Sequence, residues 1–515
     1  MILKINILKI MKNKNQKLFI ILVGVLTLIF VISPFFIDIL LARPGGGHSF
    51  SGGGGGSYSG GGSGGGGDGI GFLIYLIFSE LPPQISIPLI IGIIVLRMYL
   101  QKRKRTDNTT VVSAPGIQAR AVRHNNVEAD IENLKRIDSN FSKILFLDFV
   151  SSVFNKYYTW FGTNEFKNLS PFLNQDEIQK SASLRTDQQI TEIVIGNLRI
   201  SEINFLQNIT GISVDIEANY TKVIHGKKTR YILTERWYFN RKNGILSPEP
   251  EKMHKLSCPN CGAPADFTDN GVCQNCGTKI NIGEMQWFVK KHKVLSQEVF
   301  RTSGLAHYEP ESGTMLQTIY QSNITTYAGQ FAQLHNSDWN TWRHTFADDV
   351  VKQYFMKIYD AWSENKLDGV RNLLSDRLYE SFMFWIDAYK SAGLTNRLEN
   401  INIQNIQFAR VDLDKFYESI TVRVFASSLD YVVDKNGNVK GGSNKRPRAF
   451  SEYWTFIRRM GVEKDTYNLA TCPNCGAPAD KMGQAGVCEY CGTKISNGDF
   501  SWVLAIITQD EVYSG

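Results

Sequence analysis

Two copies of one cysteine pattern constrain the fold of this chain more than any other feature. Each copy holds two Cys-x-x-Cys pairs, spaced CxxC-x11-CxxC in the first and CxxC-x12-CxxC in the second. Two such turns place four thiolates around one centre, which is the tetrahedral arrangement that structural zinc prefers. All eight cysteines of the protein belong to these quartets: Cys258, Cys261, Cys273, Cys276, Cys472, Cys475, Cys488 and Cys491.

The quartets therefore predict two structural Zn²⁺ ions. Four protein ligands leave no coordination position open, so a catalytic zinc is not expected. Two disulfides per quartet are an alternative that requires an oxidising compartment. Iron is a second alternative, because an S4 ligand set suits both metals.

The N-terminal part of the chain has the composition of a membrane anchor. Residues 1–43 begin with a lysine-rich stretch and continue as an apolar segment, Leu18 to Ala42, long enough to span a bilayer. This segment is either a cleaved signal-type sequence or a retained transmembrane segment. Residues 44–71 hold 17 of the 44 glycines and predict a flexible Gly/Ser-rich tract, because glycine loses the most conformational entropy on ordering.

A second apolar segment, residues 72–101, predicts a transmembrane helix, and residues 102–125 follow as a basic stop and linker. Its four membrane-surface residues are Lys102, Arg103, Lys104 and Arg105. Basic residues beside a span stay on the cytoplasmic side and attract anionic headgroups. We therefore expect the glycine-rich tract outside and the bulk of the chain in the cytoplasm, where cysteines stay reduced.

The remaining sequence repeats one order of elements, so the predicted fold class is α+β with two tandem domains. The first domain covers 120–305 with a zinc ribbon at 256–281, a connector covers 306–335, and the second domain covers 336–511 with a ribbon at 470–496. Apolar periodicity predicts helices over 130–154, 166–178, 346–362 and 367–385. Alternation predicts strands at 231–239, 401–411, 417–427, 429–433 and 449–457, and one further strand after each ribbon, near Trp287 and Trp502.

This order resembles bacterial Tim44-like domain proteins with zinc ribbons, a family of zinc-ribbon domain-containing transport proteins. The resemblance is carried by the leader-like segment, Arg43-Pro-Gly-Gly-Gly, the second span with its basic stop, the aromatic strands around Trp237 and Trp454, and the two Cys-Pro-Asn-Cys-Gly-Ala-Pro ribbons. It implies cone-like domains of the NTF2-like class, with helices packed on a curved antiparallel sheet, and placement in the bacterial cytoplasmic membrane. It also implies assistance to transport, through lipid or unidentified translocation proteins, by analogy of fold.

The sequence shows no enzyme signature such as His-Glu-x-x-His, Gly-x-Ser-x-Gly or a Walker motif, and we predict a non-enzymatic membrane scaffold. The alternative is a small-ligand sensor or an enzyme that uses the cone cavity, with Asp387 among aromatics or Glu235 beside Trp237 as its acid. His225 and His292 are interpreted as solvated surface residues. The oligomeric state is left open, because two membrane spans are too few to form a conduit unless several chains assemble.

Two basic runs could contact phosphates. They are residues 290–293 and 445–448. Solvated loops, anionic lipid headgroups and nucleic acid are the three interpretations, in that order. The net charge of +7 over 515 residues is too small to favour nucleic acid.

Overall fold

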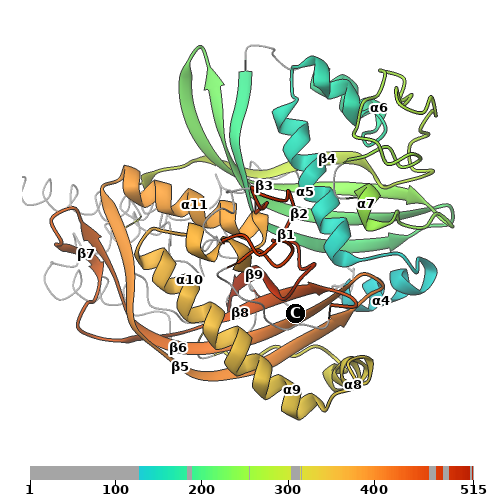
Figure 1. Ribbon diagram of the computed structural model, residues 1–515. Helices are drawn as coiled ribbons and strands as arrows, with labels where there is room; N and C mark the ends of the chain where they lie inside the picture. Colours follow the sequence, from blue (N-terminus) through green and yellow to red (C-terminus); the bar gives the residue numbers. More distant parts are fainter. Residues whose placement is uncertain are drawn as a thin grey trace, which may run out of the picture. The chain divides into compact units, whose positions relative to one another are not determined.

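The computed structural model describes residues 127–515, apart from 183–187, 254–255, 303–304, 306–313, 315, 463–470, 479–485, 511–512 and 514. Within these residues no helix is long and apolar enough to cross a membrane. The signal-type or transmembrane segment predicted at 1–43, the transmembrane helix predicted at 72–101, the glycine-rich tract and the basic stop all lie outside the described residues. The described part forms two successive sets of helices and antiparallel sheet (Figure 1), which we call the first and second repeat.

The helices of the first repeat are α4 (Val127–Ile137), α5 (Lys143–Thr159), the 3₁₀ helix η3 (Asn164–Leu169) and α6 (Gln175–Ala182). The single helix predicted over 130–154 is wrong at 138–142. Ser142 caps α5 by accepting a hydrogen bond from the Leu145 amide at 3.4 Å, and Asp138 accepts one from the Asn140 amide at 3.1 Å. Both side chains compete with helical hydrogen bonding, which ends α4 and restarts the helix.

The first sheet is built from β1 (Gln188–Phe205), β2 (Ile209–Ile224), β3 (Lys227–Lys242) and β4 (Phe288–Val299), in that order and antiparallel throughout. Alternate residues of β2, among them Val214 and Ile216, are fully buried. Helix α5 packs against β1 and covers this sheet in Figure 1. A short helix α7 (Pro250–Met253) and the first cysteine quartet lie between β3 and β4, so the quartet closes a hairpin of neighbouring strands.

The second repeat has the same order with additions. Its helical segments are α8 (Ile324–Leu334), α9 (Trp339–Phe346), a π-helical segment η6 (Ala347–Lys352), α10 (Gln353–Ser363), the 3₁₀ helix η7 (Asp368–Leu373) and α11 (Asp376–Ser391). Its strands are β5 (Leu394–Leu413), β6 (Tyr417–Asp434), β7 (Val439–Gly442), β8 (Arg448–Arg459) and β9 (Val503–Gln509). The strands predicted at 417–427 and 429–433 are one continuous strand. Helix α8 lies within the predicted connector.

The two sheets match residue by residue in register. Their orders are β1-β2-β3-β4 and β5-β6-β8-β9, with β7 paired to β6. Trp237 of β3 lies between Val214 and His292, and Trp454 of β8 lies between Val422 and Ile507. The strand predicted after each cysteine quartet does return to the sheet. This correspondence gives each paired residue of the four shared strands a counterpart in the other repeat.

Candidate metal centres

Each cysteine pair lies in a tight turn that its backbone closes. In the first quartet the Gly262 amide donates to the Cys258 carbonyl, and the Gly277 amide donates to the Cys273 carbonyl, both at 2.8 Å. Gly262 has φ 73° and Gly277 φ 69°, a left-handed conformation that favours glycine. Single bridges, Ser257 to Pro264 and Val272 to Lys279, close the two halves of this ribbon.

The second quartet repeats this backbone. The Gly476 and Gly492 amides donate to the carbonyls of Cys472 and Cys488 at 2.8 Å. The bridges become Thr471 to Pro478 and Val487 to Lys494. The two turns of each ribbon therefore face each other.

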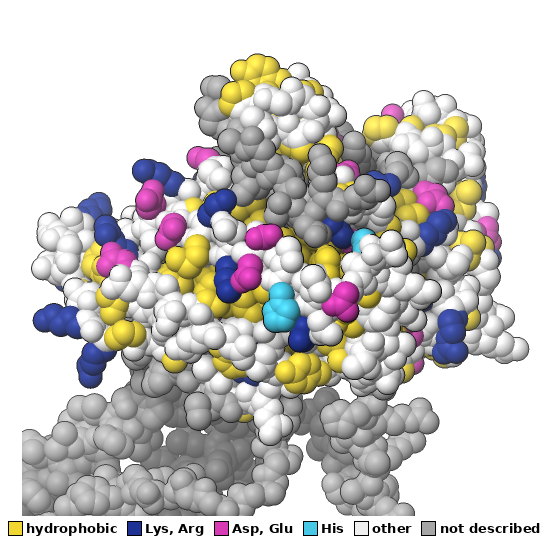
Figure 2. Space-filling view, turned by 60° about the horizontal axis from the view of Figure 1, so that its bottom comes forward, with side chains coloured by type: hydrophobic (Ala, Val, Ile, Leu, Met, Phe, Trp, Pro, Cys, Tyr) yellow, Lys and Arg dark blue, Asp and Glu magenta, His cyan; other side chains and the backbone are white. Residues whose placement is uncertain are grey.

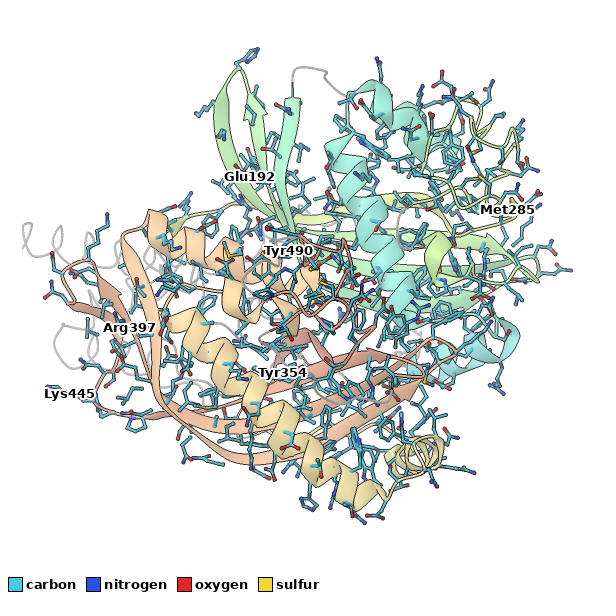
Figure 3. The ribbon with its side chains drawn as sticks, viewed as in Figure 1. Glu192, Met285, Tyr354, Arg397, Lys445 and Tyr490 are labelled. Atoms are coloured by element: carbon cyan, nitrogen blue, oxygen red, sulfur yellow. The ribbon has the colours of Figure 1, made fainter. Side chains whose placement is uncertain are left out.

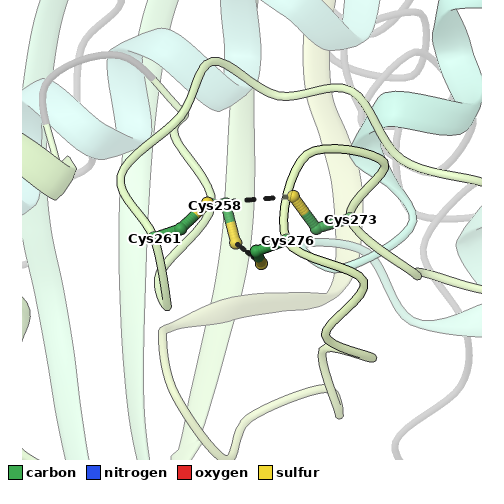
Figure 4. A group of neighbouring side chains, drawn as sticks. All are labelled: Cys258, Cys261, Cys273 and Cys276. Carbon is green, nitrogen blue, oxygen red and sulfur yellow. Dashed lines mark hydrogen bonds between the residues drawn. The ribbon is translucent and has the colours of Figure 1, made fainter.

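The sulfur atoms are spaced as one metal ion would require. Nearest sulfur pairs are 3.9 and 4.0 Å apart in the first quartet (Figure 4) and 3.8 and 3.7 Å apart in the second. A tetrahedral ion with bonds of about 2.3 Å separates its ligand sulfurs by about 3.8 Å. All four sulfurs of each group lie within 4.8 Å of one another, and none is in a disulfide. Each quartet could hold one metal ion.

Side-chain donors surround the thiols. The Asn260 amide donates to the Cys276 sulfur at 3.7 Å, and the Asn474 amide donates to the Cys491 sulfur at 3.6 Å. The hydrogen bond from Thr278 is the largest of the contributions that lower the pKa of Cys276 to about 6, and burial raises the pKa of Cys258 to about 12. A bound cation would be needed to hold all four sulfurs as thiolates together.

The first ribbon is anchored in the core of the first repeat. Cys258, Cys273 and Phe267 are fully buried in the cluster that also contains α5 and β3 side chains. The Phe267 ring meets Phe172 edge-on at 6.2 Å, and the Phe267 backbone amide donates to the side-chain Oδ1 of Asn168 at 2.9 Å. Folding of this ribbon and of the repeat are therefore linked through shared apolar contacts.

The second ribbon is held by polar contacts at the start of α11. The Asp376 carboxylate accepts hydrogen bonds from Lys494, Arg371 and Ser496. Burial alone would raise the pKa of Asp376, but the two cations hold it below its ordinary value. The buried cysteines of this ribbon, Cys472 and Cys488, form a small apolar cluster of their own with Ile495.

The other predicted contact residues have mixed outcomes. Lys102, Arg103, Lys104 and Arg105 lie outside the described residues. Lys290, Lys291 and Lys293 are exposed along β4. Figure 3 shows Lys445 at the outer end of the second sheet, whereas Arg448 is paired with Asp430 at 3.0 Å. Figure 2 shows acidic side chains interspersed with basic ones, so that face of the molecule carries both signs of charge.

His292 is not a solvated surface residue, contrary to the sequence interpretation. Its side chain is 10% exposed and pairs with the Glu177 carboxylate at 2.7 Å. The imidazole is stacked on Trp237 with ring centroids 5.1 Å apart, and Tyr157 meets it at 5.2 Å. The neighbouring lysines of the run 290–293 made an exposed position the natural interpretation. Alternate residues of a strand face opposite sides of the sheet, so His292 faces the core although its neighbours Lys291 and Lys293 are exposed.

Glu235 is fully buried, and both of its oxygens are engaged. It accepts hydrogen bonds from the Tyr158 hydroxyl and from Trp237 Nε1. In the second repeat, Glu452 accepts from the Tyr359 hydroxyl and from Trp454 Nε1. The same pair of donors, a tyrosine and a tryptophan, in both repeats indicates a structural role, and its sequence signal is the Glu-x-Trp that both aromatic strands share. Asp387 lies exposed on α11, whereas Phe384, Trp385 and Tyr389 are buried, so these aromatics do not enclose it.

The helices packed on antiparallel sheets define an α+β protein with two tetracysteine ribbons. Residues 328–472 match the model of the Tim44-like domain, which covers α9 to β8 of the second repeat and most of α8. A solved structure described as an Ntf2 like protein involved in plasmid conjugation aligns over 62% of this chain and 89% of its own, at 10% identity and a TM-score of 0.17. No curated protein matches the chain.

Proposed function

We propose that this chain is a non-enzymatic, membrane-anchored scaffold that assists transport of protein or solute at the cytoplasmic face of the bacterial membrane. The observation that carries the proposal is the Tim44-like match over residues 328–472, together with the two apolar segments that precede the described residues. The two ribbons would each hold a structural zinc ion. Neighbouring membrane or translocation proteins, with lipid headgroups, would be its partners.

The buried side chains on the core face of each sheet support the role of a scaffold rather than that of an enzyme. The buried carboxylate of Glu235 accepts one hydrogen bond on each oxygen, from Tyr158 and Trp237, and that of Glu452 accepts hydrogen bonds from Tyr359 and Trp454 on Oε2. Both carboxylates are therefore bound to aromatic side chains of the core. The core faces of both sheets are filled by side chains such as Trp237 and Trp454, which are 0% exposed. A filled interior suits a protein that works through its outer surfaces.

Crosslinking in native membranes followed by mass spectrometry tests this function. Reproducible capture of translocation subunits by the full chain, lost on deletion of residues 1–101, is the expected result. Capture that persists without the anchor, or a bound small molecule in the purified chain with no protein neighbour, would count against it. Protease added to intact cells tests the topology separately, and it should leave residues 106–515 intact.

A further inference from the structure

The two ribbons share the sequence of their cysteine turns and differ in the segment that connects them and at two further positions. Both contain Cys-Pro-Asn-Cys-Gly-Ala-Pro-Ala-Asp and Gly-Val-Cys-x-x-Cys-Gly-Thr-Lys-Ile. Between the last two cysteines the first ribbon has Gln274-Asn275 and the second has Glu489-Tyr490. Because the two cysteine turns are otherwise shared, each ribbon serves as a reference for the other at these turns.

The first difference concerns hydrogen bonds to sulfur. In the first ribbon the Asn275 side-chain amide donates to the Cys261 sulfur at 3.5 Å, in addition to the Asn260 contact with Cys276. The second ribbon keeps the equivalent of Asn260, which is Asn474. Tyr490 stands in the place of Asn275, is 66% exposed and has no side-chain amide to offer to Cys475 (Figure 3). Hydrogen bonds to metal ligands orient them and strengthen metal binding.

The second difference concerns a contact between the two cysteine turns of a ribbon. In the first ribbon, the Gln274 side chain donates to the Asp266 carboxylate at 2.8 Å, and the Gln274 backbone amide donates to the Asp266 carbonyl at 2.9 Å. These two hydrogen bonds join the turn of Cys273 and Cys276 to the segment that follows the turn of Cys258 and Cys261. Glu489 replaces it in the second ribbon, and a carboxylate has no proton to donate in this way. The first ribbon therefore has a side-chain clamp that Glu489 cannot reproduce.

The third difference concerns anchoring. Phe267 fixes the first ribbon in an apolar core, whereas Lys481 occupies that position of the second sequence. The second ribbon is held through Asp376, whose side chain is 45% exposed, and Lys494, whose side chain is 36% exposed. Ion pairs of this exposure are weak and are screened by salt, whereas apolar burial is not.

We propose that the two metal centres are inequivalent, and that the second ribbon releases its metal, and with it the contact of Lys494 with Asp376, under chelation that the first ribbon withstands. The proposal rests on the proposed zinc occupancy of both quartets. Ribbons of this kind fold with their metal, so loss of the ion also removes the Val487–Lys494 bridge that positions Lys494. The start of α11 thereby becomes a metal-dependent part of the second repeat.

The test uses the full chain, purified in detergent and refilled with zinc until two equivalents per chain are measured. EDTA is then added, and at intervals the protein is separated from the chelator by rapid gel filtration so that the zinc it retains can be measured. Parallel samples are alkylated with N-ethylmaleimide for peptide mass spectrometry. We expect two phases of one equivalent each, separated by roughly ten-fold or more in rate, as outer-shell hydrogen bonds change metal affinity by such factors. Alkylation of Cys472, Cys475, Cys488 and Cys491 should accompany the fast phase.

Exchange variants separate the hydrogen bond from general instability. Tyr490→Asn should slow the fast phase, and Asn275→Tyr should accelerate release from the first ribbon, since both positions are exposed. Asp376→Asn should accelerate release from the second ribbon alone, and high salt should act in the same direction. Circular dichroism of each variant before chelation establishes that it is folded.

Three results would overturn the proposal. They are a single release phase, alkylation of the first quartet before the second, and exchange variants that leave both rates unchanged. Failure to load two zinc ions would remove the metal centres themselves. That failure is visible before EDTA is added, and it leaves the scaffold function to the crosslinking experiment.

Discussion

At the scale of single residues, the two repeats differ in the buried ion pair of Glu177 with His292, which only the first repeat has. His292 and Ile507 occupy equivalent positions in the two sheets, since His292 pairs with Trp237 and Ile507 pairs with Trp454. Glu177 and Leu378 each lie on the helix that follows a parallel bridge to the return strand. The first repeat thus has an ion pair where the second has two fully buried aliphatic side chains.

This correspondence predicts the outcome of a double-mutant cycle. His292→Ile alone should lower the free energy of unfolding by about 3 kcal/mol, because it leaves the Glu177 carboxylate buried without its cation. The double variant Glu177→Leu/His292→Ile should fall within about 1 kcal/mol of the parent, because a well-packed apolar pair replaces a buried ion pair at little cost. Denaturant unfolding measures all four proteins, and additive losses in the double variant would contradict the prediction.

The same pair predicts a pH dependence. Burial alone would raise the pKa of Glu177, but the hydrogen bond and the charge of His292, with Lys180, hold it below its ordinary value. A depressed folded-state pKa contributes stability that is fully present above the unfolded carboxyl pKa of about 4.3 and is lost as the pH falls through the folded value. The free energy of unfolding should therefore fall more steeply below about pH 4.5 in the parent than in the double variant. Equal slopes would show that the pair contributes nothing.

At the scale of elements, the sequence predicted the aromatic strands, the strand that returns after each ribbon and part of the helices. The helices predicted over 166–178 and 367–385 are each divided in two, and α8 and α9 were not predicted. The elements that were predicted follow from periodicities that one face of a helix or strand imposes. It missed the break at 138–142, because Asp138 and Ser142 act through side-chain hydrogen bonds that no apolar pattern records. It also misplaced His292, whose buried face becomes visible only when the register with Trp237 is known.

Removal of metal should act differently on the two repeats. Cys258, Cys273 and Phe267 belong to the main core of the first repeat, whereas Cys472 and Cys488 form a separate small cluster. Complete removal of zinc should therefore lower the unfolding temperature of the first repeat more than that of the second, although the second ribbon releases its ion first. Near-ultraviolet circular dichroism follows the aromatic cores during heating, and readdition of zinc should restore both transitions. An equal shift in both repeats would contradict this prediction.

At the scale of the whole molecule, side chains of the two repeats share contacts that no sequence pattern announced. The Arg230 guanidinium lies 4.6 Å from the ring centroid of Phe384 on α11, and Phe300 meets the same ring at 5.2 Å. Leu305 and Ile232 are buried in the core cluster of the second repeat. Such contacts depend on how two folded parts meet, which periodicity within each part does not record. Phe300 and Leu305, which follow β4, thus pack into the core of the second repeat.

Phe384→Ala should separate the unfolding of the two repeats. Loss of the ring removes one contact each of Arg230 and Phe300, and truncation of a buried phenylalanine costs about 3–5 kcal/mol. Because this cost falls on the contact between the repeats, scanning calorimetry should resolve two transitions in place of a more cooperative one. Phe382→Ala is the matched control, since Phe382 is buried on the same helix against Trp362 of its own repeat. It should lower the stability of the second repeat without splitting the transition, and the same thermogram from both variants would show that Phe384 has no special part in joining the repeats.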